Sequence, residues 1–229
     1  MALDCRSAAV PNFEGEANMN NQLRRGVGLG GLALVVVLFV TILATPDPPD
    51  ATSSPAKVAM FVHAHKGGLY LNAYLTSIAV LIATAFLWYL REVVAPATPG
   101  RRLANLGFAG GLLFIVGGIF SAGASFAMAD VDNHADPDVL QTLNIFSEGV
   151  DNFAGSATAL MIGATSLGIL RSRALPNWLA YVGVVLAAAT FAIPFLGLPG
   201  VGLWFLITSI VILVTSKRPT AVRERDLSV

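Results

Sequence analysis

Six apolar stretches, none of which contains a charged side chain or a histidine, constrain this chain more than any other feature. About 20 apolar residues in a helix cross the hydrocarbon core of a bilayer, and a helix satisfies its own backbone hydrogen bonds there. The sequence therefore predicts an all-α integral membrane bundle of six transmembrane helices. The predicted spans are residues 26–44, 69–90, 103–129, 153–170, 177–195 and 201–216.

Positive charge alternates from one connection to the next. Twelve of the 14 Lys and Arg residues fall on one side of the predicted bundle, and only Lys57 and Lys66 fall on the other. Because Lys and Arg are retained in cytoplasmic connections, both termini are predicted to lie inside. Residues 1–25, expected to be disordered, and residues 217–229 are then cytoplasmic tails.

The first span predicts a bacterial cytoplasmic membrane as the location. Met19 opens the sequence Met-Asn-Asn-Gln-Leu-Arg-Arg directly before the apolar run, as in many bacterial inner-membrane proteins. The run also resembles a secretory signal with a cleavage site after Ala44. We favour an uncleaved signal anchor, because the run is long for a signal and five spans follow.

The composition excludes several classes of function. Only 12% of residues are charged, against about 25% in an ordinary soluble domain, and the net charge is zero, so nucleic acid is not an expected partner. A proton pump, a retinal protein or a membrane haem protein needs ionisable groups inside the spans. We therefore expect no cofactor, with membrane lipids as partners, and the single Cys5 forms no disulfide within the chain.

Two predicted helices begin well before their apolar parts. Ser54 precedes Pro55, and Asp136 precedes Pro137, which are favourable helix starts. The second and fourth spans are therefore predicted to carry helical extensions on the outer face.

The candidate site is a vestibule where these extensions meet the membrane. Counting 20 residues outward from the inner arginines places His65, Lys66 and Tyr70 at about the same depth as Glu148 and Asp151. A structural ion pair or a solvated face is the favoured interpretation. The alternative is a binding or catalytic vestibule, in which two carboxylates near a His could hold a divalent cation.

Other polar motifs give weaker indications. His63 and His65 point about 200° apart on a helix, so we interpret them as surface histidines at the membrane interface, and a metal site with acids of the other extension is the alternative. The acidic connection lacks the Gly and the terminal Glu of a calcium loop, and we interpret it as solvated. Its alternating residues are Asp130, Asp132, His134, Asp136 and Asp138.

Small residues form stripes on the third and fourth spans and predict close helix packing, either within the chain or with a homo-oligomer or another membrane protein. The stripes are Gly107, Gly111, Gly118, Ala122 and Ser125, and Gly155, Ala159, Gly163, Ala164 and Gly168.

Several motifs together resemble a known type of protein. They are His65 shortly before Tyr70 and Tyr74, a short Arg connection, Asp136-Pro137-Asp138, and Arg171 and Arg173 followed by Ala-Leu-Pro-Asn-Trp-Leu. This pattern resembles small, uncharacterised multi-pass membrane proteins common in actinobacteria, of the domain-of-unknown-function type. The resemblance implies the topology and no substrate, cofactor or catalytic residue.

Three functions remain open. The leading one is a non-enzymatic accessory or interaction module with an outer vestibule. The second is a passive transporter or channel for an uncharged or lipid-like solute, and the third is a metal-dependent enzyme that uses His65, Glu148 and Asp151. The second predicts a path lined by Asn72, Thr76, Ser121, Ser125, Thr158 and Thr165.

Overall fold

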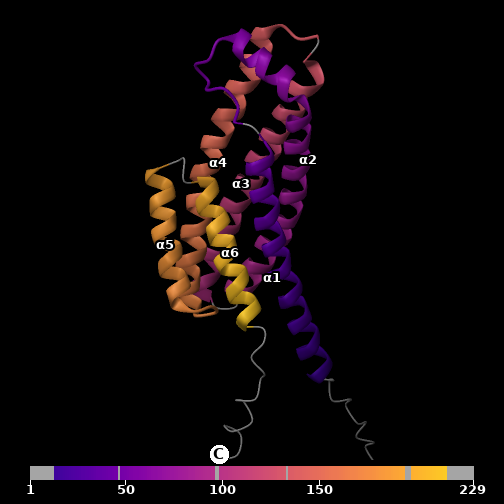
Figure 1. Ribbon diagram of the computed structural model, residues 1–229. Coiled ribbons are helices and arrows are strands. Elements are labelled where there is room, and N and C mark those ends of the chain that lie inside the picture. The colour runs from indigo at the N-terminus through magenta and orange to yellow at the C-terminus, as the bar shows by residue number, and fades with distance from the viewer. Residues whose placement is uncertain (1–12, 46, 96–97, 133, 194–196, 216–229) are drawn as a thin grey trace, which may run out of the picture.

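The computed structural model describes residues 13–45, 47–95, 98–132, 134–193 and 197–215, and the described chain forms six α-helices (Figure 1). The predicted all-α bundle is confirmed. Five helices are long and apolar enough to cross a membrane, and α5 is a shorter apolar helix of 16 residues. The helices are α1 (Phe13–Ala44), α2 (Pro55–Val94), α3 (Thr98–Val131), α4 (Pro137–Ser172), α5 (Asn177–Ala192) and α6 (Gly197–Thr215).

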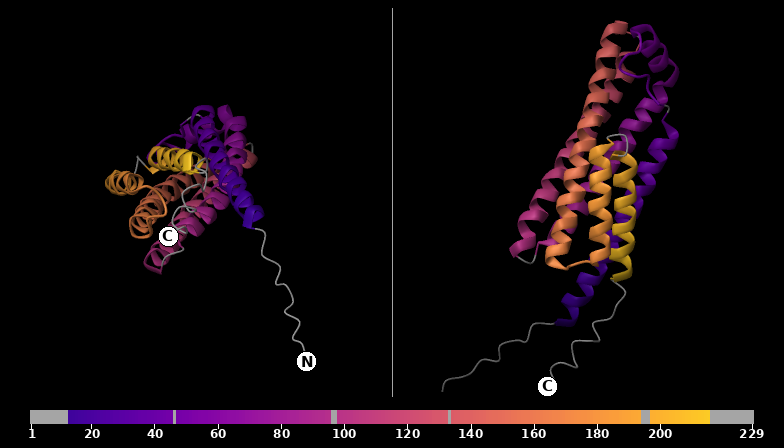
Figure 2. Two further views of the ribbon diagram at one scale, coloured as in Figure 1. Left: turned by 90° about the horizontal axis from the view of Figure 1, so that it is seen from below. Right: turned by 90° about the vertical axis from the view of Figure 1, so that its left-hand side faces the viewer.

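The antiparallel pair α3 and α4 forms the centre of the bundle. Helix α2 packs on α3, α5 and α6 pack on α4, and α1 packs on both α2 and α6. Only α2, α3 and α4 reach the upper end in Figures 1 and 2, whereas α5 and α6 end well below it. The chain thus has a full-length bundle below and a narrower unit above.

Glycine allows α3 and α4 to approach each other closely. A Cβ on Gly110 would lie 2.7 Å from the backbone nitrogen of Met161, and one on Gly117 would lie 2.8 Å from the Cβ of Ala154. Packing of this kind holds helices together in lipid. The predicted stripes serve contacts within the chain, since Gly111 and Gly118 face α2 while Gly155 meets α6.

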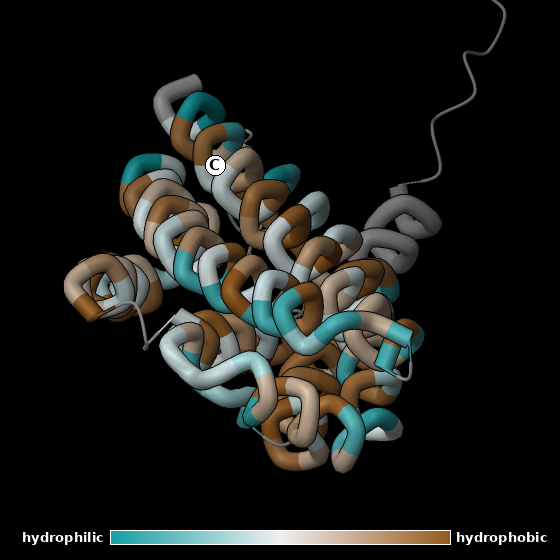
Figure 3. The backbone as a smooth tube through the Cα atoms, turned by 90° about the horizontal axis from the view of Figure 1, so that it is seen from above, coloured by the Kyte–Doolittle hydropathy of each residue, from teal (hydrophilic) through white to brown (hydrophobic). Residues whose placement is uncertain are grey.

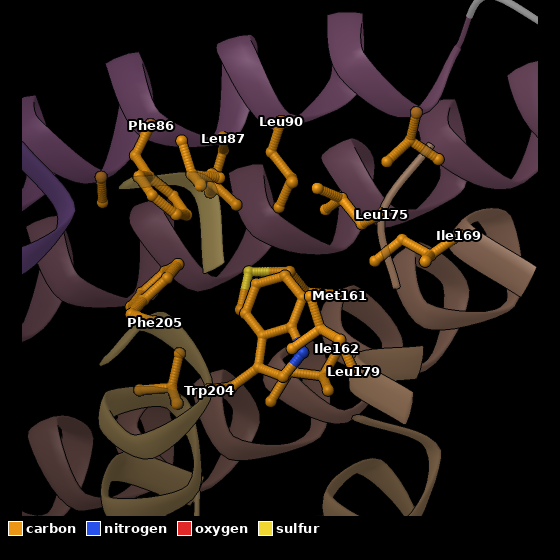
Figure 4. Packing of buried hydrophobic residues seen from close by; sticks show 14 of the residues in the cluster. Phe86, Leu87, Leu90, Met161, Ile162, Ile169, Leu175, Leu179, Trp204 and Phe205 are labelled. Atoms are coloured by element: carbon orange, nitrogen blue, oxygen red, sulfur yellow. The ribbon is translucent and has the colours of Figure 1, made fainter. Parts of the chain in front are cut away.

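The main hydrophobic core is built by residues from all six helices, and Figure 4 shows part of it. Trp204 and Phe205 of α6 are fully buried, and the ring of Phe205 meets that of Phe86 edge-on at 5.3 Å. Helix α1 contributes Leu34, which is 1% exposed. The first predicted span is therefore an integral part of the packed bundle.

The narrower unit above the bundle has a hydrophobic core of its own. We call it the crown, and it comprises residues 47–66, 128–132 and 134–148. Val58 and Val62 of α2 pack with Met128 of α3 and Leu140 of α4. Figure 3 views the molecule from the crown side, and hydrophilic residues lie along the connections that face the viewer there. The opposite end, where α1 begins and α6 ends, we call the arginine end.

The predicted helix starts are confirmed at both extensions. Helix α2 begins at Pro55 after Ser54, and α4 begins at Pro137, where the Asp136 carboxylate accepts a hydrogen bond of 3.0 Å from the N–H of Asp138. Proline suits the first turn of a helix because the N–H that it lacks has no partner there.

Two boundaries differ from the predictions. The expected disorder of residues 1–25 is wrong for residues 13–25, which form the first turns of α1. The segment 13–44 contains no proline, and each residue added to an existing helix gains a hydrogen bond. Helix α6 begins at Gly197, before the predicted start of the sixth span at residue 201, so Pro199 and Gly200 belong to its first turn. Residues 1–12, 194–196 and 216–229 lie outside the described residues.

Candidate functional site in the crown

The connection between α1 and α2 is bound across α4. The side-chain amide of Gln141 donates to the carbonyl of Ser53 at 2.7 Å, and that of Asn144 donates to the carbonyl of Pro49 at 2.8 Å. The carboxylate of Glu148 accepts from the N–H of Ala51 at 2.8 Å. Residues spaced i, i+3 and i+7 share a helix face, so one stripe of α4 holds the whole connection. We call residues 47–54 the strap.

Asp132 is the centre of the charged contacts in the crown. Its carboxylate accepts from Nδ1 of His63 at 3.3 Å and lies 3.9 Å from Nζ of Lys66. The Asp132 side chain is only 3% exposed, whereas the side chain of His63 is 75% exposed. A buried carboxylate needs such partners, because desolvation of a lone charge is costly. The cluster therefore ties the end of α3 to α2.

Helix α2 is interrupted at His65. This residue has non-helical backbone angles, with φ −120° and ψ 21°, and its Nδ1 donates to the carbonyl of Phe61 at 3.0 Å. Insertion of a side chain into the backbone ladder is a recognised cause of kinks. The imidazole of His65 is thus engaged with its own helix, and His63 is the histidine that reaches α3.

A belt of polar side chains crosses α2, α3 and α4 beneath the crown. On α2, Thr76 donates to Asn72 at 3.2 Å, and Asn72 donates to Ser125 of α3 at 3.4 Å. One turn nearer the start of α3, the hydroxyl of Ser121 lies 3.3 Å from that of Ser147 on α4, and Asp151 lies nearby. The hydroxyl and amide groups of the belt thus contact one another across three helices.

The belt contains four of the six residues predicted to line a solute path. The other two lie deeper in α4. Thr158 is fully buried and donates to the carbonyl of Ala154 in its own helix. Thr165 is 5% exposed, and its hydroxyl fills the space that a side chain on Gly107 would need. At the level of Thr158 and Thr165, the helices are therefore packed directly against one another.

The predicted vestibule residues have separate partners. Lys66 reaches Asp132, Tyr70 donates to Asp130 at 3.5 Å, and His65 bonds within α2. Glu148 holds the strap, and Asp151 lies near Glu148 and Ser121. In the described part of the chain, no group of three or more His, Cys, Asp or Glu side chains is placed to hold a metal ion.

An apolar groove opens between α3 and α4 just below the crown. Its volume is about 490 Å³, and all of its lining residues are apolar. The rings of Phe120 and Phe146 meet edge-on at 6.2 Å. The lining residues are Val116, Gly117 and Phe120 of α3 with Phe146, Gly149, Val150 and Phe153 of α4. The groove is a candidate binding surface for an apolar molecule or chain.

The sequence analysis missed Gln141 and Asn144 as the residues that hold the strap, and Asp132 as the centre of the charged contacts. A signal for the strap is present, because Gln141, Asn144 and Glu148 form a polar stripe on an extension that lies outside the predicted membrane. No sequence pattern indicated the groove, because phenylalanines are common on membrane-spanning helices.

Comparison of the chain with protein-family models, with curated proteins and with solved structures gave no match. The class of this protein is therefore assigned from its fold and candidate site alone. The chain has the architecture of a multi-pass helical membrane protein that carries a packed crown on three of its helices.

Proposed function

We propose that this chain is a non-enzymatic interaction module of a bacterial cytoplasmic membrane, with both termini inside and the crown outside. The segregation of charge supports the orientation. Lys57 and Lys66, both on the extension of α2, lie in the crown, and the described arginines lie at the other end.

The preorganised crown carries this proposal. A connection that served only to join two spans would need neither a hydrophobic cluster nor a strap. Here Leu140 is 1% exposed in the crown core, and buried Asn144 fixes the strap. A rigid surface binds with little loss of conformational entropy, which favours recognition of a partner.

Cysteine labelling tests the orientation. Met60 of the crown is 68% exposed, and Ala174 lies in the connection at the arginine end. In a Cys5→Ser background, Met60→Cys should react with an impermeant maleimide in intact cells. Ala174→Cys should react only after the cells are permeabilised. The reverse pattern would place the crown inside and overturn the proposed topology.

Photocrosslinking tests the interaction role. A photoreactive phenylalanine at Met60 should give a crosslinked product of discrete mass in intact cells. The same group at Trp178, which is 52% exposed on α5, serves as the control for contacts made by any exposed site. Identical products from both positions, or none from Met60, would contradict recognition by the crown.

The groove supports a second candidate, a passive carrier for a lipid-like solute. A Cβ on Gly149 would meet nothing within 4 Å, and this residue lines the groove. Gly149→Phe should therefore fill the groove without a clash, and it should abolish lipid exchange in liposomes if the groove is the route. Gly123→Phe is the matched control, because Gly123 also faces open space but does not line the groove.

A further inference from the structure

A small cavity lies at the arginine end, where four parts of the chain meet. Arg24 of α1, Tyr89 of α2 and Thr215 of α6 surround it, and Leu175 of the α4–α5 connection and Ile212 of α6 contribute apolar walls. Leu175 and Ile212 are 7% and 3% exposed, so these walls belong to the packed bundle. The end of α6, which contributes Thr215 to the cavity, lies at the lower part of Figure 1, beside the middle of α1.

The polar groups of the cavity favour a ligand that accepts hydrogen bonds. The Arg24 guanidinium and the Tyr89 hydroxyl both line the cavity. A guanidinium only donates hydrogen bonds, and a tyrosine hydroxyl can donate one as well. Thr215 donates to the carbonyl of Val211 at 2.8 Å. Arg24 and Tyr89 are therefore the donors available to a ligand.

The charge around the cavity favours an anion. Among the side chains that the structure describes at this end, the one carboxylate is Glu92, and it pairs with Arg91 at 2.7 Å. None of the other described arginines there forms an ion pair with a described carboxylate. These are Arg24, Arg25, Arg101, Arg102, Arg171 and Arg173.

The size of the cavity restricts the anion. Its volume is about 50 Å³, whereas one water needs about 10–15 Å³ on this kind of measure. The cavity accommodates a group of a few heavy atoms and not a nucleotide or an acyl chain. A tetrahedral oxyanion has the required size, charge and number of acceptors, and Arg matches its geometry through paired N–H groups.

We propose that this cavity binds a phosphate group, with Arg24 as the charged partner and Tyr89 as a neutral donor. The phosphate belongs to an anionic lipid headgroup or to a soluble phosphate compound. Arg24 and Tyr89 lie at the ends of predicted spans, which is the depth of lipid phosphates, and basic pockets between helices on the cytoplasmic side bind such headgroups. This inference is independent of the role of the crown.

Thermal unfolding of the full chain in a neutral detergent tests the proposal. A ligand that binds only the folded state raises the unfolding midpoint, and the rise grows with the logarithm of its concentration relative to its Kd. Phosphatidylglycerol, phosphatidylcholine with the same acyl chains, and inorganic phosphate are titrated separately. A rise with phosphatidylglycerol that exceeds the rise with phosphatidylcholine identifies a lipid source. A rise with inorganic phosphate that phosphatidylglycerol does not exceed identifies a soluble source.

Variants connect the effect to the cavity. Arg24→Gln should weaken binding roughly tenfold or more, as expected for loss of one charge-assisted pair, and Tyr89→Phe should weaken it less. Arg25→Gln is the matched control, since Arg25 is adjacent and exposed but does not line the cavity. Arg24→Lys retains the charge and tests the site if Arg24→Gln does not fold. The proposal is overturned if no ligand raises the midpoint, or if Arg25→Gln weakens binding as much as Arg24→Gln.

Discussion

The carboxylate of Glu148 accepts a hydrogen bond of 2.8 Å from the backbone N–H of Ala51, which lies 97 residues earlier in the chain. With Gln141 and Asn144, it fixes the connection of the first two spans to the fourth. The crown is therefore a tertiary structure, not a pair of helix ends joined by a free loop.

Asn144→Ala should release the strap. The side chain of Asn144 is 4% exposed and donates to the carbonyl of Pro49, so its loss leaves a backbone acceptor without its partner. We expect a loss of about 1–3 kcal/mol, with faster amide exchange over residues 47–53. Thr142→Ala is the control, because Thr142 is exposed and bonds only to its own helix. Equal exchange in both variants would contradict the strap.

Gly110→Ala and Gly123→Ala should have opposite effects. A Cβ on Gly110 would lie 2.7 Å from the backbone of Met161, whereas one on Gly123 would meet nothing within 4 Å. We expect Gly110→Ala to destabilise the protein by about 1–3 kcal/mol. Gly123→Ala should stabilise it by about 0.5–1 kcal/mol, since alanine loses less backbone entropy in a helix. Unfolding in mixed micelles would measure both, and similar stabilities would argue against close packing of α3 and α4.

Leu140→Ala should unfold the crown before the bundle. Leu140 is 1% exposed in the crown core, which is separate from the main core. Truncation of a buried leucine costs about 2–5 kcal/mol. We expect this loss to exceed the stability of a hydrophobic cluster as small as that of the crown. Amide exchange should accelerate in residues 55–66 and 137–148 while the lower parts of α3 and α4 stay protected. Val139→Ala, at a residue that is 49% exposed, should leave both regions unchanged.

His63 and Lys66 should compensate for each other at Asp132. Each pairs with the same carboxylate, and His63 is well exposed, so each single alanine variant should cost less than about 1 kcal/mol. The double variant should cost more than the sum, because the nearly buried carboxylate then has neither partner. Addition of Asp132→Asn to the double variant should restore stability. Strictly additive losses would show that Asp132 does not depend on these two cations.

The features that could be predicted from the sequence are those that depend on neighbouring residues, namely the helix starts and the apolar runs. The starts of α2 and α4 follow from Ser54-Pro55 and Asp136-Pro137, because capping and proline act within one turn. The apolar runs gave the number of helices, since each run must be helical if it lies in lipid. The beginning of α1 was missed because helix propagation into residues 13–25 leaves no apolar pattern.

The partners within the candidate site could not be predicted in the same way. Depth counting placed His65 and Glu148 at one level, but the kink at His65 turns this side chain back onto Phe61 and leaves His63 to meet Asp132. Prediction of the strap contacts would have required knowing where residues 47–54 cross α4. Both contacts depend on rotation and tertiary path, which hydropathy and charge patterns do not encode.

Helix α5 has a consequence for the surrounding lipid. Its 16 residues span only about 24 Å, whereas the hydrocarbon core of a bilayer is about 30 Å thick. Phe191 near its end is 75% exposed, so in a bilayer this residue would contact the acyl chains. A bilayer adapts to such hydrophobic mismatch by thinning locally. The bundle should therefore be surrounded by an uneven lipid annulus, compressed beside α5 and of ordinary thickness beside α2.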